Sequence, residues 1–236
     1  MAKINLKKGL TDIVLYIIIF IVVQIFLTYA GAGIWAAVKG EGYQATLLAM
    51  GTGNNAILTA LTTVFSNVIT LIIFLKAKWT PLTRNYLQSK PWISLLWVAL
   101  FTLGAIIPLE FVYEQIGVEM DANTERVFAS LMKEPWGYVA IGILAPLAEE
   151  IVFRGAILRT LLDMVSKKNH WVAIFISAVV FGLIHGNKAQ FINALLMGLL
   201  LGWMYYRTKS LVPGILMHWV NNTMAYVLNN LMPQSQ

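Results

Sequence analysis

Three charged residues lie inside a stretch that is otherwise hydrophobic enough to cross a membrane. The stretch runs from Trp136 to Leu162 and holds Glu149, Glu150 and Arg154. A charge near the centre of a bilayer costs roughly 2.5–3.5 kcal/mol on insertion scales. A helix that only anchors the chain has no reason to carry three charges, so we expect them to have a chemical role.

The spacing of these charges predicts one paired and one unpaired carboxylate. Glu150 and Arg154 are four residues apart with the glutamate first, which is the favourable order for an ion pair on a helix. Glu149 points about 100° away, and Phe153 occupies the position one turn ahead of it. Pro146 precedes the pair and loosens the backbone hydrogen bonding there.

Further polar side chains lie in the later hydrophobic segments. His185 follows Phe181 by four residues, and His218 precedes Asn222 by four, so each pair shares a helix face. We interpret Phe181 as a packing wall. His170 lies at a membrane edge and is interpreted as an ordinary interfacial residue. Two histidines within spans that also contain two glutamates favour a functional site.

Two kinds of hydrolytic chemistry fit these side chains. Burial disfavours the charged form of a carboxylate, which suits Glu149 to take a proton from water, while imidazole and amide groups of His185, His218 and Asn222 can hold an oxyanion. Alternatively, Glu149, His185 and His218 are the ligand types of a catalytic zinc site. Neither arrangement needs a cysteine, and the chain has none.

The composition indicates an all-α, polytopic membrane protein. Of 236 residues, 58% are hydrophobic and only 12% are charged, which no soluble domain of this size would show. At about 20 residues per span, the length allows six to eight helices around a polar site. The net charge of +6 is assigned to basic loops between spans rather than to nucleic-acid binding, because basic and aromatic residues do not interleave.

Seven spans are expected. Their approximate ranges are 13–29, 56–75, 92–109, 136–162, 171–186, 191–206 and 211–231. An interfacial piece precedes the second span, and an eighth span or re-entrant piece within residues 43–75 is the alternative. The first segment could be a signal peptide, but its length favours an uncleaved span.

Basic residues predict the orientation of the spans. One set of alternating loops holds most of them: Lys3, Lys7, Lys8, Lys76, Lys78, Arg84, Lys90, Arg159, Lys167, Lys168, Arg207 and Lys209. This asymmetry favours a cytoplasmic N-terminus. We divide the chain into residues 1–135, with three spans and an acidic loop, and residues 136–236, the expected catalytic core. Gly182, Gly198, Gly202 and Gly214 are expected to allow close helix packing.

Three motifs in order carry a resemblance to a known family. Glu149-Glu150-x-x-x-Arg154, Phe181-x-x-x-His185 and His218-x-x-x-Asn222 resemble the successive motifs of the CAAX prenyl endopeptidase and bacteriocin-processing family (Abi, or CPBP) of intramembrane proteases. The resemblance covers roughly residues 136–231.

The resemblance implies a role for each motif residue. Glu149 would activate water, Glu150 held by Arg154 would support it, and His185 would position the water or bind a metal. His218 and Asn222 would stabilise the oxyanion or complete the site. The family is described both as metal-dependent and as metal-free, so zinc or another divalent metal is one alternative and no cofactor is the other.

The expected protein is therefore an intramembrane endopeptidase of a bacterial inner membrane. Its expected substrate is a leader peptide, a bacteriocin precursor or a membrane-bound protein, rather than a prenylated CAAX protein. Two other classes remain open: a non-catalytic membrane immunity or partner-binding protein of the same fold, and a proton-coupled transporter, because buried Glu and His also serve proton relays.

Overall fold

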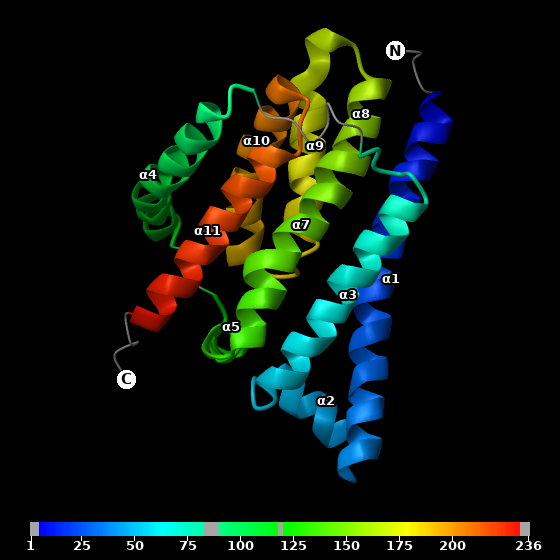
Figure 1. The fold of residues 1–236 in the computed structure, drawn as a ribbon, viewed down its shortest axis with the longest axis vertical. Coiled ribbons are helices and arrows are strands. Elements are labelled where there is room, and N and C mark those ends of the chain that lie inside the picture. The colour runs from blue at the N-terminus through cyan, green and yellow to red at the C-terminus, as the bar shows by residue number, and fades with distance from the viewer. Residues whose placement is uncertain (1–4, 83–89, 118–119, 232–236) are drawn as a thin grey trace. The chain divides into compact units, whose positions relative to one another are not determined.

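The protein is all-helical wherever its structure is described. The computed structural model describes residues 5–82, 90–117 and 120–231, and no strand occurs in these ranges. Figure 1 shows the helices of the described ranges. Each of the seven expected spans is helical over most of its length, and the expected all-α membrane bundle is confirmed.

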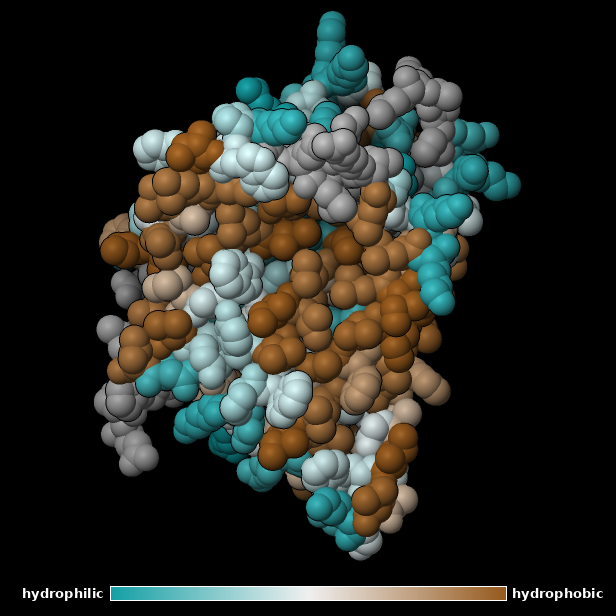
Figure 2. Space-filling model, in the orientation of Figure 1, coloured by the Kyte–Doolittle hydropathy of each residue, from teal (hydrophilic) through white to brown (hydrophobic). Residues whose placement is uncertain are grey.

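Long apolar helices make up most of the N-terminal half. They are α1 (Leu6–Lys39), α3 (Ala56–Lys76) and α4 (Ile93–Ile116), with the short α2 (Tyr43–Gly51) at the place expected for an interfacial piece. In the described ranges, α1, α3 and α10 (Lys188–Thr208) are long and apolar enough to cross a membrane. Figure 2 shows hydrophobic side chains covering α1 and α3 on the face drawn, as a lipid-facing surface requires.

The acidic loop contains a polar helix, α5 (Ala122–Lys133). Asp121 caps its first turn by accepting hydrogen bonds from the backbone amide and the hydroxyl of Thr124. The hydrogen bond from the Thr124 hydroxyl lowers the pKa of Asp121 below its usual value. The loop between the third and fourth expected spans is therefore ordered at the start of this helix.

The segment with the three charges is one helical run whose hydrogen bonding changes along its length. It consists of α6 (Pro135–Gly137), η1 (Tyr138–Leu144), α7 (Ala145–Glu149), η2 (Glu150–Leu158) and α8 (Arg159–Met164). Both η1 and η2 are π-helical. A π-helix, bonded from residue i to i+5, is rare. It occurs mostly as a single turn within an α-helix and is frequent at functional sites. Here two π-helical segments flank Glu149.

The C-terminal part forms a hairpin and a final helix. A short 3₁₀ turn, η3 (Lys167–Asn169), leads into α9 (His170–Leu183), which packs against α10, and α11 (Val212–Leu231) follows. A Cβ atom added at Gly198 would lie 2.9 Å from the Cβ of Ala178, and one at Gly202 would lie 2.9 Å from Ile174 Cγ2. The expected packing role of these two glycines in the α9–α10 hairpin is confirmed.

The fifth span ends earlier than the sequence suggested. His185 was placed inside it, but α9 ends at Leu183 and His185 lies in the turn that follows. The amide of His185 donates to the carbonyl of Gly182, and Gly186 takes a positive φ of 73° that suits glycine. The chain therefore reverses direction immediately after His185.

The residues group into two compact units. Unit 1 contains Met1–Ile18, Ile73–Met120 and Glu149–Asn221, and unit 2 contains Ile19–Ile72, Asp121–Ala148 and Asn222–Gln236. The division at residue 135 and the cytoplasmic N-terminus remain predictions. Lys3 and Arg84, which entered the charge argument, lie outside the described residues.

Candidate active site

The predicted ion pair between Glu150 and Arg154 is confirmed. An Arg154 Nη1 lies 2.9 Å from Glu150 Oε1, and both side chains are 1% exposed. The guanidinium also lies 4.5 Å from the centre of the Phe181 ring, close enough for a cation–π contact. A second guanidinium nitrogen donates to the carbonyl of Gly198 at 3.5 Å. The charge is therefore buried beside an opposite charge, while the Nε of Arg154 has no hydrogen-bond partner among the described residues.

His218 lies between the two glutamates. Its Nδ1 is 3.3 Å from Glu150 Oε1, and its Nε2 is 3.6 Å from Glu149 Oε2. The sequence had left Glu149 without a partner within its own helix, and the structure supplies one from α11. The Glu149 side chain is 16% exposed, compared with 1% for Glu150. Of the two carboxylates, Glu149 is thus the one that water reaches more easily.

The ring of Phe181 contacts both His185 and His218. Its ring lies edge-on to the rings of His185 and His218, with centroid distances of 5.1 and 5.9 Å. Phe181 therefore forms the wall that the sequence predicted. The Nδ1 of His185 lies 2.8 Å from the Phe181 carbonyl oxygen. A carbonyl oxygen only accepts, so this nitrogen carries the hydrogen and neutral His185 has its lone pair on Nε2.

Gly214 has a role in the site that the sequence did not suggest. A Cβ atom added there would lie 2.9 Å from Glu150 Oε2. That oxygen is buried and has no hydrogen-bond partner among the described residues. The packing interpretation of Gly214 was thus incomplete, because its missing side chain leaves room for the glutamate.

Gly214→Ala should lower turnover on the order of tenfold, because the new methyl group displaces Glu150 and misplaced catalytic groups are costly. The matched control is Gly104→Ala in α4, where an added Cβ meets nothing within 4 Å. Steady-state kinetics and thermal unfolding of both variants would check this. Equal effects on turnover at the two positions would contradict a site role for Gly214.

Asn222 lies in unit 2, whereas the other five predicted site residues lie in unit 1. Its side-chain amide donates to the carbonyl of Ile141 at 2.8 Å. In a π-helix the amide of residue 146 would serve that carbonyl, but residue 146 is a proline and has no N–H. Asn222 thus supplies a donor where Pro146 cannot, a structural task in addition to the oxyanion role predicted for it.

The structure also shows functional candidates that the motifs missed. Other side chains donate to carbonyls of the π-helical segments, as Asn222 does. They are Asn67 to Ala140 at 3.4 Å, Thr80 to Ile151 at 2.7 Å, Ser177 to Phe153 at 3.3 Å and Arg159 to Gly155 at 3.0 Å. Only the contact of Arg159 with Gly155 is local, at four residues; the other three donors come from distant parts of the chain, and no residue spacing signals their contacts.

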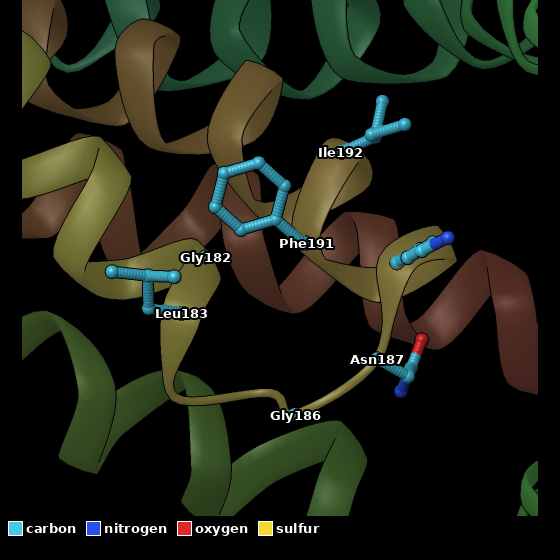
Figure 3. A pocket seen from close by; sticks show the side chains of 7 residues that line it. Gly182, Leu183, Gly186, Asn187, Phe191 and Ile192 are labelled. Atoms are coloured by element: carbon cyan, nitrogen blue, oxygen red, sulfur yellow. The ribbon is translucent and has the colours of Figure 1, made fainter.

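A cavity of about 520 Å³ lies at the turn between α9 and α10. Figure 3 shows its lining residues, among them Gly182, Leu183, Phe191 and Ile192. Gly182 and Leu183 follow Phe181 by about 100° and 200° around α9. The cavity therefore opens on a different face of α9 from the Phe181 ring, and we do not assign it to the site.

The zinc alternative finds little support in the arrangement of donors. A catalytic zinc ion is held by three protein ligands. Within the described ranges, no group of three or more His, Cys, Asp or Glu side chains could hold a metal ion. Glu149 and His218 lie together, but the predicted set with His185 does not form a ligand group among the described residues.

Comparison with known proteins identifies the region that carries the site. The family described as "Type II CAAX prenyl endopeptidase Rce1-like" matches residues 131–224, which include all six predicted site residues. This region is therefore similar to the CAAX prenyl endopeptidase (CPBP) family. The resemblance inferred from the three motifs is confirmed.

A curated relative of this chain points the same way. The Bacillus subtilis (strain 168) protein named "Putative membrane peptidase YdiL" is 28% identical over 126 residues. The match covers 51% of this chain and 50% of that protein, so this chain spans about half the length of the curated relative. No solved structure matches the chain. The comparisons support a membrane peptidase and leave the substrate and the roles of single residues to be tested.

Proposed function

We propose that this protein is a membrane-embedded endopeptidase in which Glu149 activates the attacking water. The observation that supports this most is the unequal setting of the two glutamates. Glu150 is fully enclosed by Arg154 and His218, while Glu149 keeps 16% exposure beside the same imidazole. Two carboxylates in different environments are suited to different tasks.

The proposed step needs only groups of this chain and water. Glu149 takes a proton from water, and the water oxygen bonds to the carbonyl carbon of the scissile peptide. The carbonyl oxygen becomes an oxyanion, and the family resemblance implies that His218 and Asn222 would stabilise it or complete the site. The C–N bond then breaks as Glu149 passes its proton to the leaving nitrogen, giving a new carboxylate and a new amine.

His185 is suited to orient that water. Its Nδ1–H is committed to the Phe181 carbonyl, so neutral His185 offers only an acceptor at Nε2. An acceptor can receive a hydrogen bond from water but cannot stabilise an oxyanion. Of the roles predicted for His185, we therefore propose water positioning.

His218 is suited to hold the two glutamates of the site in place. Its Nδ1 lies 3.3 Å from Glu150 Oε1 and its Nε2 lies 3.6 Å from Glu149 Oε2. A carboxylate only accepts, so the Nδ1–H of His218 can donate to Glu150. Arg154 supplies the positive charge beside the same carboxylate.

The finer identity of the enzyme follows from the resemblance. We propose a bacterial inner-membrane protein with a cytoplasmic N-terminus. Its proposed substrates are leader peptides, bacteriocin precursors or membrane-bound proteins, with prenylated CAAX proteins less suited. The protein purified in detergent and reconstituted into liposomes should cut membrane-anchored reporter peptides, detected as new termini by mass spectrometry. Failure to cut a broad library of such peptides would oppose the proposal.

Chelation tests the metal alternative directly. Prolonged treatment with EDTA and 1,10-phenanthroline should leave cleavage unchanged, because no group of three ligands exists in the described residues. A known zinc endopeptidase in the same detergent serves as the positive control. Loss of cleavage that added zinc restores would show that a metal takes part.

A further inference from the structure

We infer that Thr80, in the N-terminal half of the chain, is a positioning residue for the segment that carries the glutamates. This inference rests on the proposed function. Thr80 lies in the link after α3, outside residues 131–224 that match the family. It is 1% exposed, although its hydroxyl is polar.

The Thr80 side chain contacts the catalytic segment at two points. Its hydroxyl donates to the carbonyl of Ile151 at 2.7 Å, one residue after Glu150. Its methyl group lies against Gly155, where an added Cβ would come within 2.4 Å of Thr80 Cγ2 and 2.7 Å of Oγ1. Thr80 therefore packs against η2 on the residues that directly follow Glu150 and Arg154.

The link that carries Thr80 is itself held in place. Trp79 packs its ring against Tyr16 and Phe74, with centroid distances of 5.1 and 5.0 Å. The carbonyl of Trp79 accepts a hydrogen bond from Arg159 at 2.8 Å. Pro81 follows Thr80 and restricts its backbone to extended conformations. A rigid segment of this kind can fix the positions of the residues that it contacts.

The π-helical form of η2 explains why such a support matters. A wide i to i+5 turn is rare, and a regular α-helix is the competing form. Changing between them would rotate Arg154 relative to Glu150, because the two forms differ in residues per turn. A donor from outside the helix, fixed to the Ile151 carbonyl, favours the form in which the ion pair measures 2.9 Å.

The test compares variants that differ in the donor. Thr80→Val removes the hydroxyl but keeps the branched shape, and Thr80→Ser keeps the hydroxyl. One hydrogen bond contributes about 1 kcal/mol net, and a free-energy difference of about 1.4 kcal/mol corresponds to a factor of ten. We therefore expect Thr80→Val to lower kcat on the order of tenfold. KM should not change, since Thr80 is buried and does not meet substrate, and Thr80→Ser should restore most of kcat.

Hydrogen exchange provides a readout that does not depend on cleavage. In the full-length protein in detergent, amides of residues 150–158 should exchange faster in Thr80→Val than in wild type or Thr80→Ser. The matched control is Thr102→Val, which removes a buried hydroxyl that donates to its own helix at Val98. If no peptide is cut but this exchange pattern appears, the proposed function fails and the positioning role stands.

Three results would overturn the positioning role. The first is wild-type kcat and exchange in Thr80→Val. The second is equal loss in Thr80→Ser and Thr80→Val, which would show that volume rather than the hydroxyl matters. The third applies if Thr80→Val does not fold. Thr80→Cys is then compared with Thr80→Ser, because a thiol has a similar shape but is a much weaker donor, and equal kcat in these two variants would overturn the role.

Discussion

Glu149→Gln should lower turnover by about 10²- to 10⁴-fold, the range that a general base contributes, while the unfolding temperature stays close to that of the wild type. Glutamine keeps the size of the side chain but cannot take a proton from water. Glu149 is 16% exposed and its ionic contact with His218 is 3.6 Å long, so little native-state stability depends on its charge. Cleavage of a reporter peptide and thermal unfolding in detergent measure the two quantities.

Glu150→Gln is the matched comparison, because it makes the same chemical change one residue along the helix. Glu150 accepts from both Arg154 and His218 and is fully buried, so this variant should lose stability first and activity as a consequence. A stable but inactive Glu150→Gln beside an active Glu149→Gln would reverse the assignment. If both variants cleave normally, neither carboxylate is the base and the proposed mechanism fails.

Arg154→Ala should lower the free energy of unfolding by about 3–5 kcal/mol, because removing one partner leaves a buried, uncompensated charge. The charge left behind is Glu150, which is 0% exposed. The variant also loses the contact with the Phe181 ring and the hydrogen bond to the Gly198 carbonyl. We expect low yield, a lower unfolding temperature and loss of cleavage.

Two further variants separate charge from shape at this position. Arg154→Lys should recover part of the stability, because lysine keeps the positive charge but not the planar, multiply donating group. The double variant Arg154→Ala with Glu150→Gln should be less destabilised than the sum of the single changes, since the unpaired charge is gone. A fully stable Arg154→Ala protein would contradict the importance of the ion pair.

Local spacing explains which parts of the site could be predicted from the sequence. The Glu150–Arg154 pair follows from an i to i+4 separation within one helical run, and it occurs as expected. The spans follow from hydrophobic runs, because within a membrane the backbone N–H and C=O groups of each run must form hydrogen bonds inside the run itself, as a helix does. The order of the motifs indicated the family. Each of these signals is contained in a few neighbouring residues or in the composition of one continuous segment, apart from the order of the motifs along the chain.

Contacts between distant segments explain what could not be predicted. No local pattern places His218 beside Glu149, or the hydroxyl of Thr80 on the Ile151 carbonyl, since these pairs are 69 and 71 residues apart. The π-helical turns were also unforeseen. Pro146 indicated weakened backbone bonding, but the donor that replaces its missing amide comes from Asn222, far along the chain.

The exposure of Glu149 to water has a consequence for the response of the protein to membrane voltage. Moving one elementary charge across a whole membrane at 100 mV involves about 2.3 kcal/mol. In the proposed cleavage the proton moves from water to Glu149 and then to the leaving nitrogen, about 3 Å at each transfer. This distance is roughly a tenth of a hydrocarbon core of about 30 Å. The voltage would then contribute only about 0.2 kcal/mol to each transfer. Cleavage in energised liposomes should therefore be nearly independent of voltage, whereas a protein that carried protons across the membrane would respond to it strongly.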